Sequence, residues 1–400
     1  MQKGKNCDIM LMKELFEKAL PSRPSTGKFV FMCLCSAVCA ALPGTKGSSP
    51  FAGIAFIFAV AALFAFSRTL PVLLPAGLFF AAVFVYTQNT FWAVCACSVT
   101  VAIGLFAYLA VTTRSPVVFL IIPASYAFAV LAGGSLMSAL IALVPFPAAL
   151  VLAYCIGKRR NCSTAVGATA ATLGCSVLAA LSVYVFVSNG RVDFSLLKDA
   201  ANGLYESLIR QYTEQFEEML ARYAALGYDI SKLGISSSEI SETAATVFSV
   251  LPAVFALVVG TASYTAHKYS LALIAASGRS KLACKSSFEF DMSVVSVAVF
   301  FIACLVMTVA SYSEGGATVA VIAENVFLTV LPGLSLVGLA VMLGRNRKKK
   351  KYIAPTVVAG IMMLILPSLV LAVLSFIGCS SIIRNTYAKA VSAGNGDKNS

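Results

Sequence analysis

The chain of 400 residues is 59% hydrophobic and only 12% charged, with a mean hydropathy of +0.88. Soluble domains are about half apolar and about one quarter charged, so this composition excludes a soluble globular protein and predicts an all-α, polytopic transmembrane helical bundle. The net charge of +13 comes from basic residues clustered between apolar runs. That pattern is typical of cytoplasmic loops and argues against a nucleic-acid partner.

Eleven segments, within a range of 9 to 12, approach the roughly 20 apolar residues that a bilayer-crossing helix requires. They lie at 29–43, 51–67, 69–87, 91–112, 116–133, 136–156, 165–187, 246–266, 293–312, 318–343 and 354–380. The expected domains are a cytoplasmic amphipathic arm (1–28), an N-terminal membrane bundle of seven spans (29–188), an extracytoplasmic helical insert (189–245), a C-terminal bundle of four spans (246–383) and a polar tail (384–400).

The basic clusters give the expected orientation. With the N-terminus in the cytoplasm, all the major clusters fall inside, as the positive-inside rule requires. These clusters are Arg68, Arg114, Lys158–Arg160, His267–Lys285 and Arg345–Lys351. The sequence therefore predicts a multi-pass membrane protein whose N-terminus lies in the cytoplasm. Eleven spans place the C-terminal tail, which contains Arg384, outside the cell, and this is where that count agrees least with the positive-inside rule. The tail would be inside if one of the short spans does not cross the membrane.

The insert at 189–245 is the only sizeable hydrophilic segment between spans. Its apolar residues recur every three to four positions, which predicts an amphipathic helix over 194–224. They are Leu197, Leu204, Leu208, Tyr212, Phe216, Leu220 and Tyr223. Ser236 and Glu239 have capping-box spacing and are expected to start the next helix. Two interpretations remain open: a helical hairpin over the outer mouth of the bundle, or a moving lid or docking surface.

The sequence lacks the residues of the common catalytic and cofactor sites. Most of the twelve cysteines lie in apolar runs, where a thiol packs as a small hydrophobe, and a single histidine supplies too few nitrogens for most metal sites. No G-x-x-x-x-G-K-[ST] phosphate loop is present. We therefore expect no catalytic residues, metal or cofactor, and no enzyme activity or ATPase in this chain.

Glu324 is the one clear ionisable residue inside an expected span, and such residues are costly and tend to be functional. Asn325 follows it, and Pro332 loosens the helix two turns later. We take Glu324, Asn325, Gly333 and Ser335 as candidate ligand-binding residues. A purely structural hydrogen-bonding role for the first two is equally consistent with the sequence. At the inner end of the 246–266 span, the candidate interface anchors are Tyr264, His267 and Lys268.

Residues 195–385 resemble the YybS-type family of predicted bacterial membrane proteins, domain of unknown function 2232. The resemblance follows the order of an amphipathic helix, a span from Leu251-Pro252 to Tyr264 and Lys268, the stretch Phe288–Asp291, and Asn325 followed by Gly333-Leu334-Ser335. It implies a remote relation to the membrane-embedded substrate-binding components of energy-coupling-factor transporters. Those components capture vitamins or metals and borrow ATPases from other chains. The present chain has additional N-terminal spans.

Two functions follow from these observations. In the first, the protein is a solute-binding or transport-related membrane subunit, and its partners are the lipid bilayer, ATPase or other membrane subunits and an unknown small-molecule solute. In the second, it is a non-transporting scaffold or regulatory protein of cell-envelope or developmental assembly, with the 189–245 insert as its docking surface.

Overall fold

The computed structural model describes residues 25–44, 90–113, 115–133, 135–190, 194–226, 237–277, 292–313, 316–348 and 367–396, with a few isolated positions between 57 and 83. Every element in these ranges is a helix. Seven helices are long and apolar enough to cross a membrane, or eight if α11 (Ser237–Ser249) and α12 (Leu251–Ala276) form one bent span. The chain is therefore an all-α polytopic membrane bundle, as its composition predicts.

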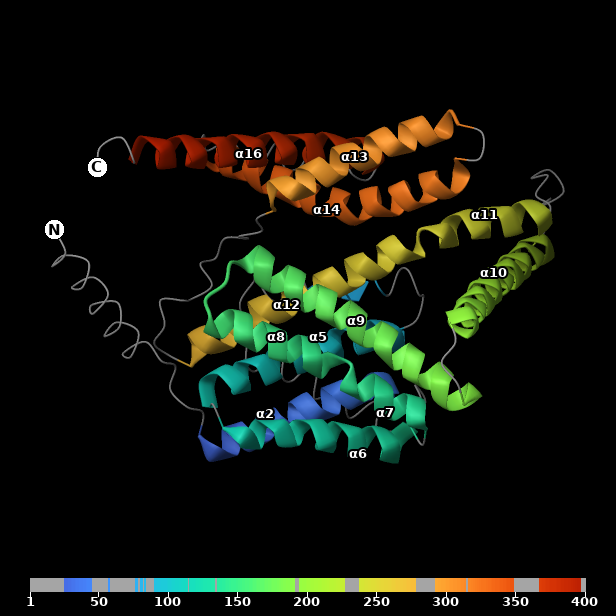
Figure 1. Cartoon of the computed structure of the whole chain (residues 1–400). Helices are drawn as coiled ribbons and strands as arrows, with labels where there is room; N and C mark the ends of the chain where they lie inside the picture. Colours follow the sequence, from blue (N-terminus) through green and yellow to red (C-terminus); the bar gives the residue numbers. More distant parts are fainter. Residues whose placement is uncertain are drawn as a thin grey trace. The chain divides into compact units, whose positions relative to one another are not determined.

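The chain divides into two compact units. Unit 1 comprises residues 1–190 and 258–289, and unit 2 comprises residues 191–257 and 290–400. The described elements of unit 1 are α2 (Thr26–Ala41), η1 (Leu42–Gly44), α5 (Thr90–Thr113), η2 (Pro116–Leu120), α6 (Ile121–Gly133), α7 (Leu136–Leu143), α8 (Pro145–Gly157), α9 (Cys162–Asn189) and most of α12 (Figure 1).

The core of unit 1 forms around α5, which packs against α2 and α8. Phe106 and Tyr269 are fully buried in this core. Gly104 allows α12 to approach closely, because a Cβ at this position would lie 2.6 Å from the Tyr269 ring. The Ser270 hydroxyl then donates a hydrogen bond to the Gly104 carbonyl at 3.0 Å. Small and hydroxyl residues therefore set this helix contact, as is usual between membrane helices.

Short polar residues fix several helix ends. The Ser135 hydroxyl accepts a hydrogen bond from the Ser138 N–H at 3.1 Å at the start of α7, and Ser293 does the same for Ser296 at 3.3 Å at the start of α13 (Val294–Ser311). Gly190 ends α9 with a φ of +71°, a left-handed conformation that glycine adopts without steric cost.

Unit 2 contains two groups of helices. In the first, α10 (Phe194–Ala225) packs against α11 and confirms the helix predicted over 194–224. In the second, α13 and α16 (Pro367–Gly396) both pack against α14 (Ala317–Lys348). The Phe300 ring stacks on Phe327 with centroids 5.2 Å apart and meets the Phe376 ring edge-on at 6.1 Å. These rings join the three helices into one apolar core.

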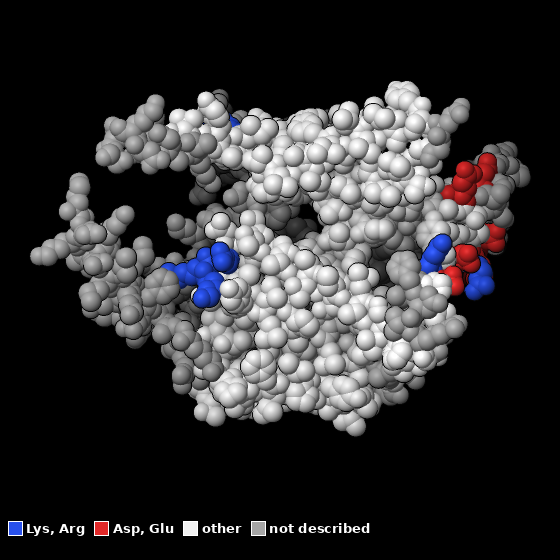
Figure 2. Space-filling model, viewed as in Figure 1, with Lys and Arg blue, Asp and Glu red and all other residues white. Residues whose placement is uncertain are grey.

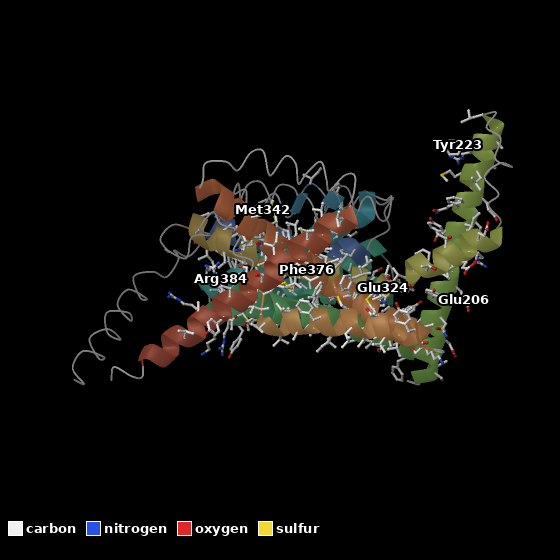
Figure 3. The ribbon with its side chains drawn as sticks, turned by 90° about the horizontal axis from the view of Figure 1, so that it is seen from above. Glu206, Tyr223, Glu324, Met342, Phe376 and Arg384 are labelled. Carbon is white, nitrogen blue, oxygen red and sulfur yellow. The ribbon has the colours of Figure 1, made fainter. Side chains whose placement is uncertain are left out.

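The crossing of α14 and α16 depends on two glycines. A Cβ on Gly338 would collide with the Leu374 carbonyl oxygen, and a Cβ on Gly378 would collide with the Leu334 carbonyl oxygen. The contacts are reciprocal between the segments Leu-Ser-x-x-Gly at 334–338 and at 374–378. On the N-terminal side of both glycines, the Ser335 hydroxyl donates to the Leu371 carbonyl at 2.9 Å. The two helices are therefore parallel, as Figure 3 also shows from Glu324 to Met342 and from Phe376 to Arg384.

This direction corrects the expected end of the chain. The sequence predicted one span at 354–380 that returns from the end of α14 and leaves a polar tail at 384–400 on the opposite face. Instead, α16 is helical from Pro367 to Gly396 and ends on the same side as α14; residues 354–366 lie outside the described ones. The Arg384 end of α16 thus shares a side with the end of α14 that leads into the basic cluster Arg345–Lys351.

We predict that cysteines introduced at Asn346 and Ser392 react with a membrane-impermeant thiol reagent from the same side of the membrane. The experiment uses the full chain on a cysteine-free background, in intact cells and in inverted vesicles. Both positions should be protected in intact cells and labelled in inverted vesicles, because the basic cluster near Asn346 is expected inside. Labelling of the two positions from opposite sides would contradict the parallel arrangement.

The remaining spans agree with the sequence to different degrees. The spans expected at 51–67 and 69–87 lie outside the described residues apart from isolated positions, as does most of the arm at 1–28, so the count of eleven stays a prediction. The segment at 116–133 is a shorter apolar helical stretch. The span expected at 246–266 falls on the end of α11 and on α12, and α12 continues beyond it to Ala276.

Candidate functional site

The membrane-directed helix that follows the insert is interrupted at Val250, between the end of α11 and the start of α12. Pro252 contributes to this break, because proline has no N–H and its ring clashes with the carbonyl four residues before it. The hydrogen-bond ladder resumes with the Val254 N–H donating to the Val250 carbonyl at 3.1 Å. In a continuous helix the preceding bond would join the Ala253 N–H to the Ser249 carbonyl.

Asn325 of α14 takes the place of that missing bond. Its side-chain carbonyl accepts from the Ala253 N–H at 2.9 Å, and its side-chain amide donates to the Ser249 carbonyl at 2.8 Å. The same amide also donates to the Val321 carbonyl in its own helix at 2.9 Å. A side chain inserted into the ladder is a recognised cause of helix kinks. Asn325 therefore holds the break open while it satisfies both backbone groups.

An amide is well suited to this position. Unpaired backbone groups are costly where water is absent, so the N–H and the carbonyl that the break exposes each need a partner. Asparagine carries one acceptor and two donor hydrogens on a single short side chain, whereas leucine offers neither and aspartate offers only acceptors when ionised. Asn325 thus hydrogen-bonds a neighbouring helix, which is one of the two roles that the sequence left open, and its partner is the backbone at the break.

Glu324 precedes Asn325 in α14 (Figure 3) and is partly buried. It is the only acidic residue in the seven candidate spans of the described chain. A carboxylate at such a depth is costly unless it meets a cation, a hydrogen-bond donor or a proton. The site thus combines an interrupted helix, an asparagine that bonds to its backbone, and an acidic residue that precedes this asparagine in α14.

Gly333 and Ser335 do not join Glu324 at one site. Ser335 lies eleven residues along the helix, which corresponds to about 16 Å of rise. Its buried hydroxyl donates to the Leu331 carbonyl at 2.8 Å and to Leu371 of α16. Ser335 therefore stabilises the α14–α16 crossing. Pro332 lies inside α14, which stays helical on both sides of the proline. A ligand-binding role for Gly333 and Ser335 stays a prediction.

The three residues predicted as interface anchors are buried inside unit 1. The exposed fractions of Tyr264, His267 and Lys268 are 9%, 5% and 6%. The His267 Nδ1 atom lies 3.6 Å from the Cys162 sulfur, and the Lys268 Nζ atom lies 5.6 Å from the centre of the Tyr264 ring. Because α12 extends to Ala276, these residues lie more than two turns before its end. Their polar groups are therefore surrounded mainly by other residues of unit 1, and an anchoring role at the membrane interface stays a prediction.

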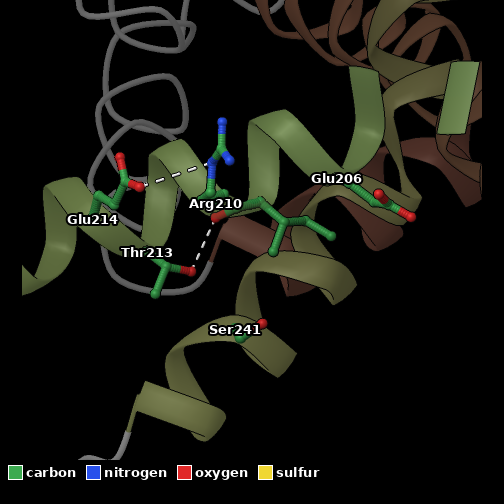
Figure 4. Close-up of a pocket in the computed structure, with 6 residues that line it drawn as sticks. Glu206, Arg210, Thr213, Glu214 and Ser241 are labelled. Atoms are coloured by element: carbon green, nitrogen blue, oxygen red, sulfur yellow. Dashed lines mark hydrogen bonds and ion pairs between the residues drawn. The ribbon is translucent and has the colours of Figure 1, made fainter. Parts of the chain in front are cut away.

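Two open pockets lie in unit 2. One lies on the α10–α11 pair, has a volume of about 310 Å³ and is lined by Glu206, Arg210, Glu214 and Ser241 among others (Figure 4). Its Arg210–Glu214 ion pair, at 3.8 Å, is solvent-exposed and so contributes little to stability. The other, of about 530 Å³, lies along α13 and α16 near Arg384. The sequence did not indicate it, because its residues come from two helices distant in the chain.

The part of the chain that the structure describes holds no group of three or more histidine, cysteine, aspartate or glutamate side chains placed to bind a metal.

Comparison with known proteins gives a match to a family model: the model described as a predicted membrane protein, DUF2232, covers residues 94–379. This match begins about a hundred residues before the resemblance recognised at 195–385. No curated protein and no solved structure matches the chain.

Proposed function

The chain belongs to the DUF2232 family of predicted membrane proteins, and on that premise we propose that it is a solute-binding or transport-related membrane subunit without an ATPase of its own. It acts in the bacterial plasma membrane with its N-terminus in the cytoplasm, as the distribution of basic residues supports. The sequence has no phosphate-binding loop of its own, and we propose that any ATPase in the assembly is a separate partner subunit.

One observation supports this proposal: the helix is interrupted where the amphipathic α11 meets the apolar α12, and the asparagine that bonds to the break follows an acidic residue, Glu324, in α14. Interrupted helices form the substrate and ion sites of many secondary transporters, because their exposed backbone groups can exchange a protein partner for a solute. Here Asn325 occupies those backbone groups at 2.8–2.9 Å, and Glu324 precedes it in α14. A solute that displaced the amide would meet the Ser249 carbonyl and the Ala253 N–H.

The charge at the site favours a cationic solute or a proton. Glu324 supplies one negative charge within an apolar span, and the other six of the seven unbent candidate spans in the described chain contain no acid. A bound cation would pair with this carboxylate, and acidic groups within spans usually have such a partner. Through the adjacent Asn325, binding at Glu324 would be coupled to the geometry of the α11–α12 break.

We predict that Glu324→Gln abolishes ligand-induced stabilisation but leaves the ligand-free melting temperature unchanged, because glutamine keeps the shape and loses the charge. The purified full chain is heated alone and with sodium, magnesium, thiamine or spermidine. A cation at 100 times its Kd should stabilise the wild type by about 2.7 kcal/mol. The control is Glu242→Gln, which removes an exposed acid on α11 and should keep the effect. If Glu324→Gln were stabilised as much as the wild type, Glu324 would not belong to the binding site. If no cation stabilised the wild type, the proposal of a cationic solute would be wrong.

The α10–α11 hairpin supports the second candidate function, a scaffold. Tyr212 packs edge-on against Phe248 of α11 with ring centroids 6.0 Å apart, so the apolar side of α10 is used internally. The acidic side chains Glu206, Glu214, Glu217 and Glu218 remain exposed, with Glu214 and Glu218 ion-paired to arginines of the same helix, and Figure 2 shows acidic and basic groups together on the α10–α11 pair. Such a surface of mixed charge suits a polar protein partner. Co-purification of wall or division proteins would favour this function, and co-purification of ATPase subunits would favour the first.

A further inference from the structure

The pocket between α13 and α16 in unit 2 is a groove with an apolar part and a charged end. Its volume is about 530 Å³, and Phe301, Phe376, Ile383, Arg384 and Tyr387 are among its lining residues. The Phe301 and Phe376 rings lie 6.2 Å apart and are 45% and 55% exposed. In a membrane these rings face hydrocarbon rather than water.

The lining residues of α16 form one continuous helical face. Phe376, Ile383 and Tyr387 are separated by seven and four residues, which places them on one side of the helix. Phe376 is near the middle of the candidate span Leu369–Ala388, and Arg384 is in its last turns. Eight residues separate Phe376 from Arg384, or about 12 Å of rise. The groove therefore runs from the hydrocarbon layer to the level of the lipid headgroups.

The parallel direction of α14 and α16 identifies the membrane side. The end of α14 leads into the basic cluster Arg345–Lys351, and the Arg384 end of α16 lies on that same side. Clusters of lysine and arginine mark the cytoplasmic face. That leaflet carries the anionic lipids and a negative surface potential, so it supplies a counter-ion of the right charge for Arg384. Tyr387 beside it belongs to the residue types enriched at this depth.

We propose that this groove is a binding site for an anionic phospholipid of the cytoplasmic leaflet. One acyl chain lies along Phe301 and Phe376, and the phosphate accepts hydrogen bonds from the Arg384 guanidinium. Arginine suits this role because its planar group binds phosphate oxygens in pairs and is always charged. No acidic side chain among the described residues lines the groove to compete for Arg384. The site is independent of Glu324 and of the proposed transport function.

Native mass spectrometry of lipids retained by the full chain tests this proposal. The protein is equilibrated with vesicles of equal parts phosphatidylglycerol and phosphatidylcholine and then extracted. The wild type should retain phosphatidylglycerol preferentially, and Arg384→Gln should lower that preference about fivefold, the effect of one basic side chain near the surface. Arg384→Lys should keep most of the preference. The matched control, Arg222→Gln, removes an exposed arginine of α10 and should change nothing.

A second measurement uses the wild type alone, so that it does not depend on the folding of a variant. A phosphatidylglycerol analogue with a photoreactive acyl chain is cross-linked, and the modified peptides are mapped. Cross-links should concentrate on residues 297–305 and 373–387. Cross-links found only elsewhere, equal retention of both lipids by the wild type, or an unchanged preference in a folded Arg384→Gln variant would each overturn the proposal.

Discussion

Gly338→Leu is expected to destabilise unit 2 by about 3 kcal/mol, the upper part of the usual range for forcing extra atoms into a well-packed contact. The new Cβ alone would collide with the Leu374 carbonyl oxygen and lie 3.1 Å from the Gly378 nitrogen. Both obstacles are backbone atoms, so no side-chain rotation can relieve the clash. The helices must separate, and the Ser335 hydrogen bond to Leu371 is then lost as well.

This effect is measured as the free energy of unfolding of the reconstituted protein. Gly378→Leu should give a similar loss, because the crossing is nearly symmetric. Gly167→Ala in α9 is the control: nothing lies within 4 Å of a Cβ placed there, and replacement of a helical glycine by alanine is expected to stabilise by about 0.5–1 kcal/mol. If Gly338→Leu were as stable as the wild type, the close crossing would be wrong.

Asn325→Leu is expected to cost about 1–3 kcal/mol, because it removes the partners of two backbone groups that are shielded from water. Leucine has a similar volume, so the loss comes from the hydrogen bonds rather than from a cavity. The loss is smaller to the extent that the Ala253 N–H bonds directly to the Ser249 carbonyl, which would close the break and bring α11 and α12 closer to one continuous helix. The variant should therefore change both the stability and the local conformation.

Two measurements separate these effects: the free energy of unfolding, and the distance between spin labels placed at 242 and 262 across the break. Leucine at Val326, which is 39% exposed, is the matched control and should leave both values unchanged. A stable Asn325→Leu variant whose label distance is also unchanged would show that Asn325 does not hold the break. A changed label distance together with a lost response to cations would show that Asn325 affects both the break and the proposed binding site.

The two residues of the Glu324–Asn325 pair therefore have different expected signatures. Asn325 makes three hydrogen bonds to backbone groups, so its replacement should affect stability first. Glu324 has no comparable structural role among the described contacts, so Glu324→Gln should affect ligand response first. Measured together, the two variants distinguish the structural interpretation of this pair from the binding interpretation, which the sequence left equally open.

The sequence by itself determined the properties that depend on local composition. Mean hydropathy predicts an all-α membrane bundle, because a backbone in hydrocarbon must satisfy its own hydrogen bonds. The period of the apolar residues predicts α10 to within one residue at its C-terminal end. The rarity of acids in apolar runs singles out Glu324, and its neighbour Asn325 is found in a polar contact.

Only the tertiary structure decided which distant segments meet. An asparagine at position 325 could form hydrogen bonds with any of several neighbouring helices. Its insertion between Ser249 and Ala253 depends on where α14 packs. Likewise, hydropathy treats the apolar residues from 354 to 380 as one span. The direction of α16 follows instead from the fit of Gly338 against Gly378, a contact across forty residues. Contacts between distant residues depend on shape and hydrogen-bond geometry, which composition and spacing do not record.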